Sequence, residues 1–462
     1  MRNRSELSLA IFLLVAGYSL VAGLLVQLVI APRIDPGLLG SIGLIPGLDT
    51  ASFHEMAVSM ASAMKEEGWS AWEWNPGWSA NQPVGVMAVF YYYLGASPLV
   101  LLPFNAFVHG ASAVVLFHLI HQLGFSFRES IAGVLPFSFL PSTLTWVTQF
   151  HKDGIYCLGL FVLLLGCVTI LKANRLGFYG VGLVGMVAGG ILMATMRGYS
   201  TTLVVVAIGL ASILVVLPSL IRCGKGQRSQ VLGSFACLLL GSVLLIPFAG
   251  TKGGEVSQDR VVRVDSSEEG SAPNSTDQWT SQENENYIPP ATPWITSDWL
   301  PSSVDSAFHR LIHNRTVFLW MFPDAGSIVD GERKFDSVGS VVAYAPRALL
   351  IGLFSPFPNS WLGEARSPTG GLQRRVAAIE TLLGYLLLVG AGSGLILTRS
   401  RNLIFVLLVS LLLVVVLVYP VPAIGSLFRL RFGPFSLFLG VGLAFLFRYF
   451  WKCREMRSRV PR

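Results

Sequence analysis

Two aspartates lie beside apolar segments, where they could act on a substrate at a membrane surface. Asp49 follows the first apolar segment, and Asp153 lies in the short run His151-Lys-Asp-Gly. A carboxylate in such a place can act as a general base or bind a divalent cation such as Mg²⁺ or Mn²⁺. Asp49 and Asp153 are therefore the candidate catalytic residues, and the metal ligands if a metal is bound. The alternative is that each aspartate caps a helix.

Basic and polar residues near the same segment ends could bind a phosphate. Guanidinium groups bind phosphate through two parallel hydrogen bonds, so the arginines are the strongest candidates. The alternative is that these long side chains only reach lipid headgroups. The predicted substrate- and phosphate-binding residues are Lys152, Arg197, Arg429, Arg431, His54, His151 and Tyr199.

A third acid, Glu380, lies about one turn inside a late apolar segment. We expect it to form a structural ion pair, with Arg374, Arg375 or a more distant base, rather than to act in catalysis. Arg347, Arg374 and Arg375 are weaker candidates for binding phosphate.

The composition places all these residues in a membrane protein. Of 462 residues, 53% are hydrophobic and 13% are charged, against about 25% charged in a typical soluble domain. Several apolar runs reach the ~18–20 residues that a bilayer crossing needs. The formal net charge is +7, but the basic residues lie mostly in short loops, where they report orientation, so we predict no nucleic-acid partner. The five cysteines form no C-x-x-C pair, which argues against a zinc site or a disulfide framework.

The apolar runs predict an all-α polytopic membrane protein with about ten transmembrane helices. The basic residues of the short loops put both termini in the cytoplasm of a cell with an inner membrane. The first run, Leu7 to Ile30, is too long for a signal peptide and is taken as the first helix. The predicted helices cover about 7–30, 98–121, 130–148, 154–171, 178–196, 200–220, 231–249, 374–397, 402–420 and 431–450.

The spacing of the helices predicts three parts. Residues 1–249 form an N-terminal membrane module of seven helices, with an outer loop at 31–97 whose tryptophans and tyrosines favour interfacial helices. Residues 250–373 form a long outer loop with a mobile polar part at 251–300, a small cap at 305–345 and a re-entrant or interfacial helix before Pro356. Residues 374–462 form a C-terminal module of three helices and a basic tail.

Taken together, these motifs resemble the bacterial GT-C glycosyltransferases, which include the protein O-mannosyltransferases and the lipid A aminoarabinose transferase. The resemblance covers most of the chain loosely. It uses Asp49, Asn81-Gln-Pro-Val-Gly-Val with Tyr91-Tyr-Tyr-Leu-Gly-Ala-Ser-Pro98, Lys152-Asp153, Arg197-Gly-Tyr199, Ser355-Pro-Phe-Pro358 and Gly425-x-x-x-Arg-x-Arg431. The sequence departs from the best-known members in three ways. It has the single acid Asp49, between Leu48 and Thr50, in place of a pair of acids, and Gln82-Pro83 in place of the Pro-Pro of the interfacial helix. It also lacks the large soluble C-terminal domain of some members.

The resemblance implies an activity and partners. The donor would be a polyprenyl-phosphate-linked sugar, and the acceptor a glycan, lipid or protein on the outer face of the membrane. Asp49 would be the catalytic base or a metal ligand, Asp153 the second acid, and the basic residues would neutralise the donor phosphate.

Two other functions remain open. One is an O-antigen or polysaccharide polymerase or ligase that uses lipid-pyrophosphate glycans, with outer arginines as its main binding groups. The other is a flippase or transporter of lipid-linked sugars, which would place polar groups and broken helices near the membrane midplane.

Overall fold

The computed structural model describes residues 2–34, 44, 50–75, 82–224, 227–248, 290–323, 325–361 and 368–458. This part of the chain is helical and contains no strand, apart from one isolated bridge between Ile328 and Ala423. Eight of its helical segments are long and apolar enough to cross a bilayer. The prediction of an all-α polytopic membrane protein is thereby confirmed.

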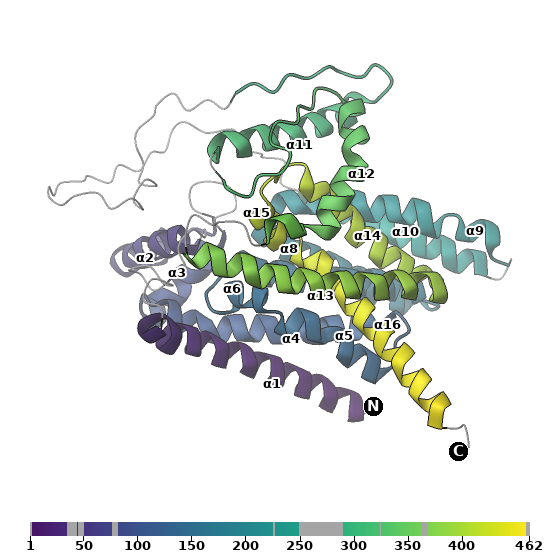
Figure 1. The fold of residues 1–462 in the computed structure, drawn as a ribbon, viewed down its shortest axis with the longest axis horizontal. Helices are drawn as coiled ribbons and strands as arrows, with labels where there is room; N and C mark the ends of the chain where they lie inside the picture. Colours follow the sequence, from purple (N-terminus) through teal and green to yellow (C-terminus); the bar gives the residue numbers. More distant parts are fainter. Residues whose placement is uncertain are drawn as a thin grey trace.

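The long helices run side by side as a bundle (Figure 1). They are α1 (Arg2–Leu25), α4 (Leu102–Gln122), α7 (Lys152–Lys172), α8 (Leu176–Ala211), α10 (Arg228–Leu245), α13 (Pro368–Thr398), α14 (Arg401–Val418) and α16 (Phe432–Ser458). The shorter helices are α2 (Thr50–Glu67), α3 (Gln82–Leu94), α5 (Phe127–Phe139), α6 (Leu144–Val147), α9 (Ser219–Arg222), α11 (Ser302–Met321), α12 (Val338–Phe354) and α15 (Ile424–Leu430).

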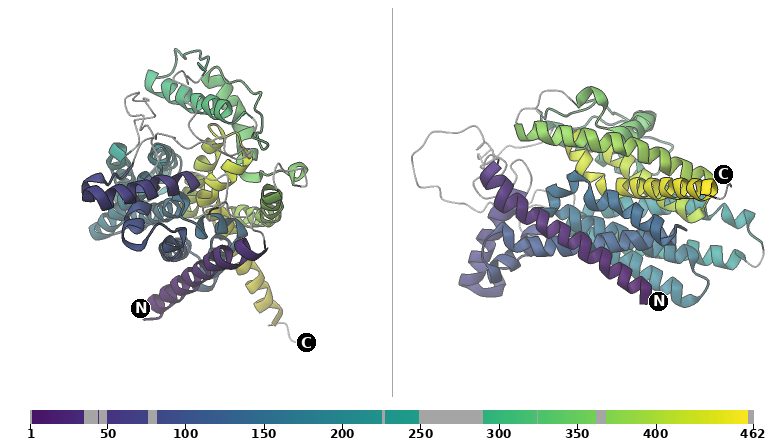
Figure 2. Two further views of the ribbon diagram at one scale, coloured as in Figure 1. Left: turned by 90° about the vertical axis from the view of Figure 1, so that its left-hand side faces the viewer. Right: turned by 60° about the horizontal axis from the view of Figure 1, so that its bottom comes forward.

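The bundle has two chemically distinct ends. At the first, which we call the terminal end, α1 begins and α16 ends, and Arg448 of α16 bonds Glu129 at the start of α5 at 2.7 Å. Arg401 of α14 also donates to Leu171 O here, at 2.6 Å. The opposite end, the loop end, carries α2, α3, α11 and α12, as two further views show (Figure 2). Both chain termini therefore lie at the same end of the bundle.

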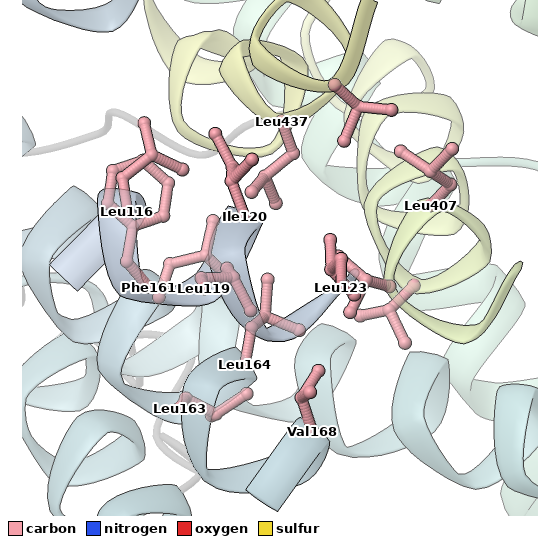
Figure 3. Packing of buried hydrophobic residues seen from close by; sticks show 14 of the residues in the cluster. Leu116, Leu119, Ile120, Leu123, Phe161, Leu163, Leu164, Val168, Leu407 and Leu437 are labelled. Carbon is pink, nitrogen blue, oxygen red and sulfur yellow. The ribbon is translucent and has the colours of Figure 1, made fainter. Parts of the chain in front are cut away.

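Helices α7 and α8 pack closely against each other. A Cβ added at Gly159 of α7 would lie 2.8 Å from Gly189 O and 2.8 Å from Met193 N, both in α8. Such contacts between small residues let two membrane helices approach at backbone distance. Around them, leucines and phenylalanines of α4, α7, α14 and α16 fill the core (Figure 3).

The structure differs from the predicted third crossing. The expectation of one continuous helix over 130–148 is wrong, because α5 ends at Phe139. Leu140 is extended, with ψ 135°, and it precedes Pro141, whose ring disfavours a helical conformation of the residue before it. Residues 140–151 then continue as short turns and α6 to the start of α7.

The predicted helices at 178–196 and 200–220 form one helical run that is broken at Arg197 (φ −149°, ψ 74°). The run Leu176–Ile221 has 46 residues, which as a straight helix would be about 69 Å long, or twice a bilayer core. It does not run straight. Tyr179 and Cys223 both lie close enough to the Arg401 guanidinium at the terminal end to interact with it electrostatically, whereas Arg197 contacts the first turn of α7 at the loop end. The chain therefore reaches the loop end at Arg197 and returns.

Two groups of short helices cover the loop end. In the first predicted outer loop, α2 packs on α3, and Trp72 Nε1 donates to Gly85 O at 3.0 Å. In the second, α11 and α12 form a cap in which Arg315 donates to Asp330 O at 2.6 Å. Helix α12 ends at Phe354, just before Ser355-Pro356. Residues 251–289 of the predicted polar loop lie outside the described residues.

Candidate functional site

Four charged or titratable side chains meet at the loop end of the bundle, around Asp153. Asp153 lies in the first turn of α7, which begins directly after the extended residue His151. An Nη atom of Arg197 hydrogen-bonds Asp153 Oδ1. Asp153 Oδ2 lies 2.7 Å from His151 Nδ1 and 3.6 Å from Arg429 Nε. We call Asp153, His151, Arg197 and Arg429 the Asp153 cluster.

His151 links Asp153 to Arg429. Its Nε2 lies 3.3 Å from Arg429 Nη1, and because a guanidinium can only donate, Nε2 is the acceptor in that contact. Its Nδ1 lies 2.7 Å from Asp153 Oδ2 and 3.3 Å from Asp153 N.

Two guanidinium groups approach the same carboxylate in the Asp153 cluster, one from Arg197 and one from Arg429. Asp153 and Arg197 are buried, at 3% and 2% exposure, whereas the Arg429 side chain is 20% exposed. Guanidinium groups bind phosphate and carboxylate through charge-assisted hydrogen bonds. The arrangement can therefore bind an anion, with Arg429 as the side chain nearest the surface.

The break in α8 is what aims Arg197 at Asp153. The helical backbone stops at Arg197, and its carbonyl instead accepts a hydrogen bond from Ser200 Oγ at 2.7 Å. The guanidinium also lies over the Tyr156 ring, with its carbon 5.0 Å from the ring centre. In an unbroken helix the chain would continue in the same direction, and Arg197 would not lie at the point where α8 turns back at the loop end.

Helix α15 brings in Arg429 from the C-terminal module. Its start is held to the segment after α11, because Ile424 N donates to Ser327 O at 2.9 Å and Val329 N donates to Pro422 O at 3.0 Å. The cluster thus joins parts of the chain that are up to 278 positions apart.

Arg431 does not join the Asp153 cluster. Its guanidinium donates to Ile351 O at 3.2 Å, to Gly352 O and to Ser355 O. These are carbonyls at the C-terminus of α12, which carries partial negative charge and has no further helical donors. The structure therefore separates Arg429 and Arg431, which were predicted to bind phosphate in one site. Arg429 contacts Asp153 and His151, whereas Arg431 binds the end of α12.

The remaining candidate residues lie around α2 and α8. His54 Nδ1 lies 2.8 Å from Tyr91 Oη, and burial lowers the pKa of His54 although Glu55 opposes the shift. Burial likewise raises the pKa of Tyr91. Lys152 Nζ lies 5.3 Å from the centre of the Phe53 ring, so it faces α2 and not Asp153. Tyr199 is 46% exposed, and Asp49 lies outside the described residues.

Asp153 does not fit a divalent cation. Its two oxygens already face two guanidinium groups and a histidine, so a metal would bring a third positive group to the same carboxylate. Across the described ranges, no group of three or more His, Cys, Asp or Glu side chains is placed to hold a metal.

Two contacts of buried charged residues had no signal in the sequence. Glu380 accepts a hydrogen bond from Ser142 N at 2.5 Å, in place of the predicted ion pair with Arg374 or Arg375. Arg315, which is 2% exposed, donates to the carbonyls of Val329 and Asp330. Partners of this kind are backbone groups, which every residue carries, so residue types alone do not point to them.

Comparison of the chain with protein-family models, with curated proteins and with solved structures found no match.

Proposed function

We propose that this chain is a membrane glycosyltransferase that moves a sugar from a polyprenyl-phosphate donor to an acceptor at the outer face of the membrane. The observation that carries the proposal is the pair of guanidinium groups, Arg197 and Arg429, that meet at Asp153 at the loop end. A sugar linked to a lipid by one phosphodiester carries a negative charge at its phosphate, and guanidinium groups bind phosphate through charge-assisted hydrogen bonds. Its lipid chain would lie in the bilayer beside the helices.

In the proposed reaction the acceptor hydroxyl attacks the anomeric carbon of the donor sugar. A bond forms between the acceptor oxygen and this carbon, the bond from the carbon to the phosphate oxygen breaks, and the hydroxyl proton passes to Asp49. The polyprenyl phosphate leaves with the electron pair, and attack from the opposite side inverts the configuration. Arg429 and Arg197 stabilise the charge that develops on the leaving phosphate.

Asp153 has a positioning role in this proposal. Both of its oxygens face cationic or N–H groups, so neither is directed at an acceptor hydroxyl. It holds Arg197, His151 and Arg429 in one arrangement before the donor arrives, which lowers the cost of ordering them on binding.

The proposal needs the loop end to face outward. In support, basic residues gather where the helices begin or end at the terminal end. The positive-inside rule assigns such an end to the cytoplasm. We infer ten crossings of the membrane. Helix α5 together with residues 140–151 is counted as one crossing, and the parts of the run Leu176–Ile221 before and after Arg197 are counted as two. The basic residues concerned are Arg128, Lys172, Arg175, Arg228, Arg399, Arg401, Arg448 and Lys452.

One observation favours a second candidate function, a polymerase or ligase acting on lipid-pyrophosphate glycans. Because Asp153 is engaged by arginines, the described part of the site offers cations and no free carboxylate. An enzyme that relies on arginines alone would need only such groups. The role of Asp49 separates the two proposals, because only the glycosyltransferase needs its proton-accepting carboxylate.

The test uses the full-length protein in lipid nanodiscs. Arg429→Gln removes a charge-assisted interaction worth about 1.5–3 kcal/mol, so donor binding should weaken roughly 10- to 100-fold. Arg347, a weaker phosphate-binding candidate in the sequence, pairs in the structure with Asp330 of the cap and not with the Asp153 cluster. Arg347→Gln should therefore leave donor binding unchanged. Asp49→Asn should abolish transfer but not donor binding. Normal donor affinity in a folded Arg429→Gln variant would remove the proposed function, and normal transfer in Asp49→Asn would favour the second candidate.

A further inference from the structure

A second polar cavity lies on another side of α15 from the Asp153 cluster. Arg429 and Arg431 are two positions apart, so their side chains leave the helix in different directions. Arg429 faces Asp153, whereas Arg431 lines a cavity of about 20 Å³ together with Glu380 of α13. Its apolar wall is formed by Leu140, Leu353, Phe428, Phe432, Phe435 and Leu439.

Two buried polar atoms at this cavity have no hydrogen-bond partner. Glu380 is 6% exposed; its Oε1 accepts from Ser142 N, but its Oε2 has no partner. Arg431 is 1% exposed; its Nη atoms bind the carbonyls of α12, but its Nε has no partner. Within the described residues no ion pair joins Glu380 to Arg431. A buried polar atom without a partner costs about 1–3 kcal/mol, so two of them at one cavity indicate a ligand.

The chemistry of the cavity selects a neutral ligand group. A cation would be repelled by Arg431, and an anion by a charged Glu380. A hydroxyl suits both atoms, since its oxygen accepts from the N–H of Arg431 Nε and its O–H donates to Glu380 Oε2. A cavity of about 20 Å³ has room for one water-sized group.

The residues that line the cavity indicate which kind of molecule carries the hydroxyl. Most lining residues are buried, but Leu353 of α12 and Phe428 of α15 are only partly buried, so they mark the mouth. Both are apolar, and a ligand that enters there must present an apolar body to them. An aqueous solute such as a free sugar would have to leave its other hydroxyls against these walls without partners.

We propose that this cavity binds the hydroxyl group of a long-chain alcohol or a similar amphipathic lipid, between Glu380 Oε2 and Arg431 Nε. The body of the ligand lies past Leu353 and Phe428 toward the membrane. This site is independent of the sugar transfer proposed above, because it shares no residue with the Asp153 cluster.

The test uses a photoreactive dodecanol and its methyl ether, which has the same chain but cannot donate a hydrogen bond. Each probe is added to the full-length protein in lipid nanodiscs, and crosslinks are mapped by mass spectrometry. The alcohol should label the peptides that contain Leu353 and Phe428 roughly tenfold more than the ether does, in line with one or more lost hydrogen bonds.

Variants separate this reading from a cavity that holds water alone. Glu380→Leu should remove the preference for the alcohol, whereas Glu380→Gln, which keeps a donor and an acceptor, should retain it. Arg347→Gln is the matched control outside the cavity and should behave as the wild type. Equal labelling by alcohol and ether, or no labelling of these peptides in the folded wild type, would overturn the proposal, and the second result would assign the cavity to water. If Glu380→Leu does not fold, the wild-type ratio and Glu380→Gln still decide.

Discussion

Replacing Asp153 by Asn should destabilise the protein strongly. The change keeps the size of the side chain and removes its charge. Two guanidinium groups, Arg197 and Arg429, then lie close together without the acid that compensates them, and Arg197 is 2% exposed. Removing one partner of a buried ion pair costs about 3–5 kcal/mol, chiefly because the other charge stays buried and unpaired.

An exposed ion pair of the same chain sets the scale. Arg347 and Asp330 are joined at 3.0 Å, but the Arg347 side chain is 47% exposed. Solvent screens such a pair, and its contribution is about 0–1 kcal/mol. Arg347→Gln is therefore the matched control, since it also removes one charge from an ion pair at the loop end.

The free energy of unfolding can be measured by reversible titration with SDS, followed by circular dichroism. We expect Asp153→Asn and Arg197→Gln each to lose several kcal/mol, as buried pairs do. The double variant should lose less than their sum, with a coupling energy of about 0.5–3 kcal/mol. Additive losses would refute the argument, and so would a loss for Asp153→Asn no larger than that of Arg347→Gln.

Three further predictions concern other parts of the structure. Gly159→Ala should cost about 1–3 kcal/mol of stability, because its Cβ would clash with the backbone of α8, whereas Gly177→Ala, where nothing lies within 4 Å, should be tolerated; the same SDS titration compares them. Arg431→Met leaves carbonyls of α12 without donors, so the amides of residues 338–355 should exchange with deuterium faster while those of α7 stay unchanged, and equal exchange in both would argue against its capping role. Burial opposes ionisation of Asp330, but hydrogen bonds from Arg347 and Tyr344 outweigh it and hold the pKa of Asp330 below its usual value. Because the folded-state pKa is lowered, ionised Asp330 stabilises the cap above the unfolded pKa of about 3.9, and this stabilisation is lost as the pH falls below that value. Proteolysis of the cap should therefore accelerate below about pH 4 in the wild type. A pH response of the same size in Asp330→Asn would contradict this.

The sequence alone determined that the protein is an all-α polytopic membrane protein and approximately where its long apolar helices lie. Crossing a bilayer requires about twenty apolar residues in a row, and that requirement is local, so a window of sequence reports it. The same holds for Arg197, whose position between two apolar runs predicted a boundary that appears as the break in α8. Where local chemistry competes, the prediction failed: Leu140-Pro141 ended α5 inside a run that is apolar throughout.

Only the tertiary structure decided which charged groups meet. Asp153 lies 44 positions from Arg197, and His151 lies 278 from Arg429, distances over which residue types carry no information about pairing. Arg429 and Arg431 read alike in the sequence, yet one faces the Asp153 cluster and the other the carbonyls of α12. The physical reason is that a long-range contact depends on how helices pack and turn about their axes, and no short stretch of the chain fixes that rotation.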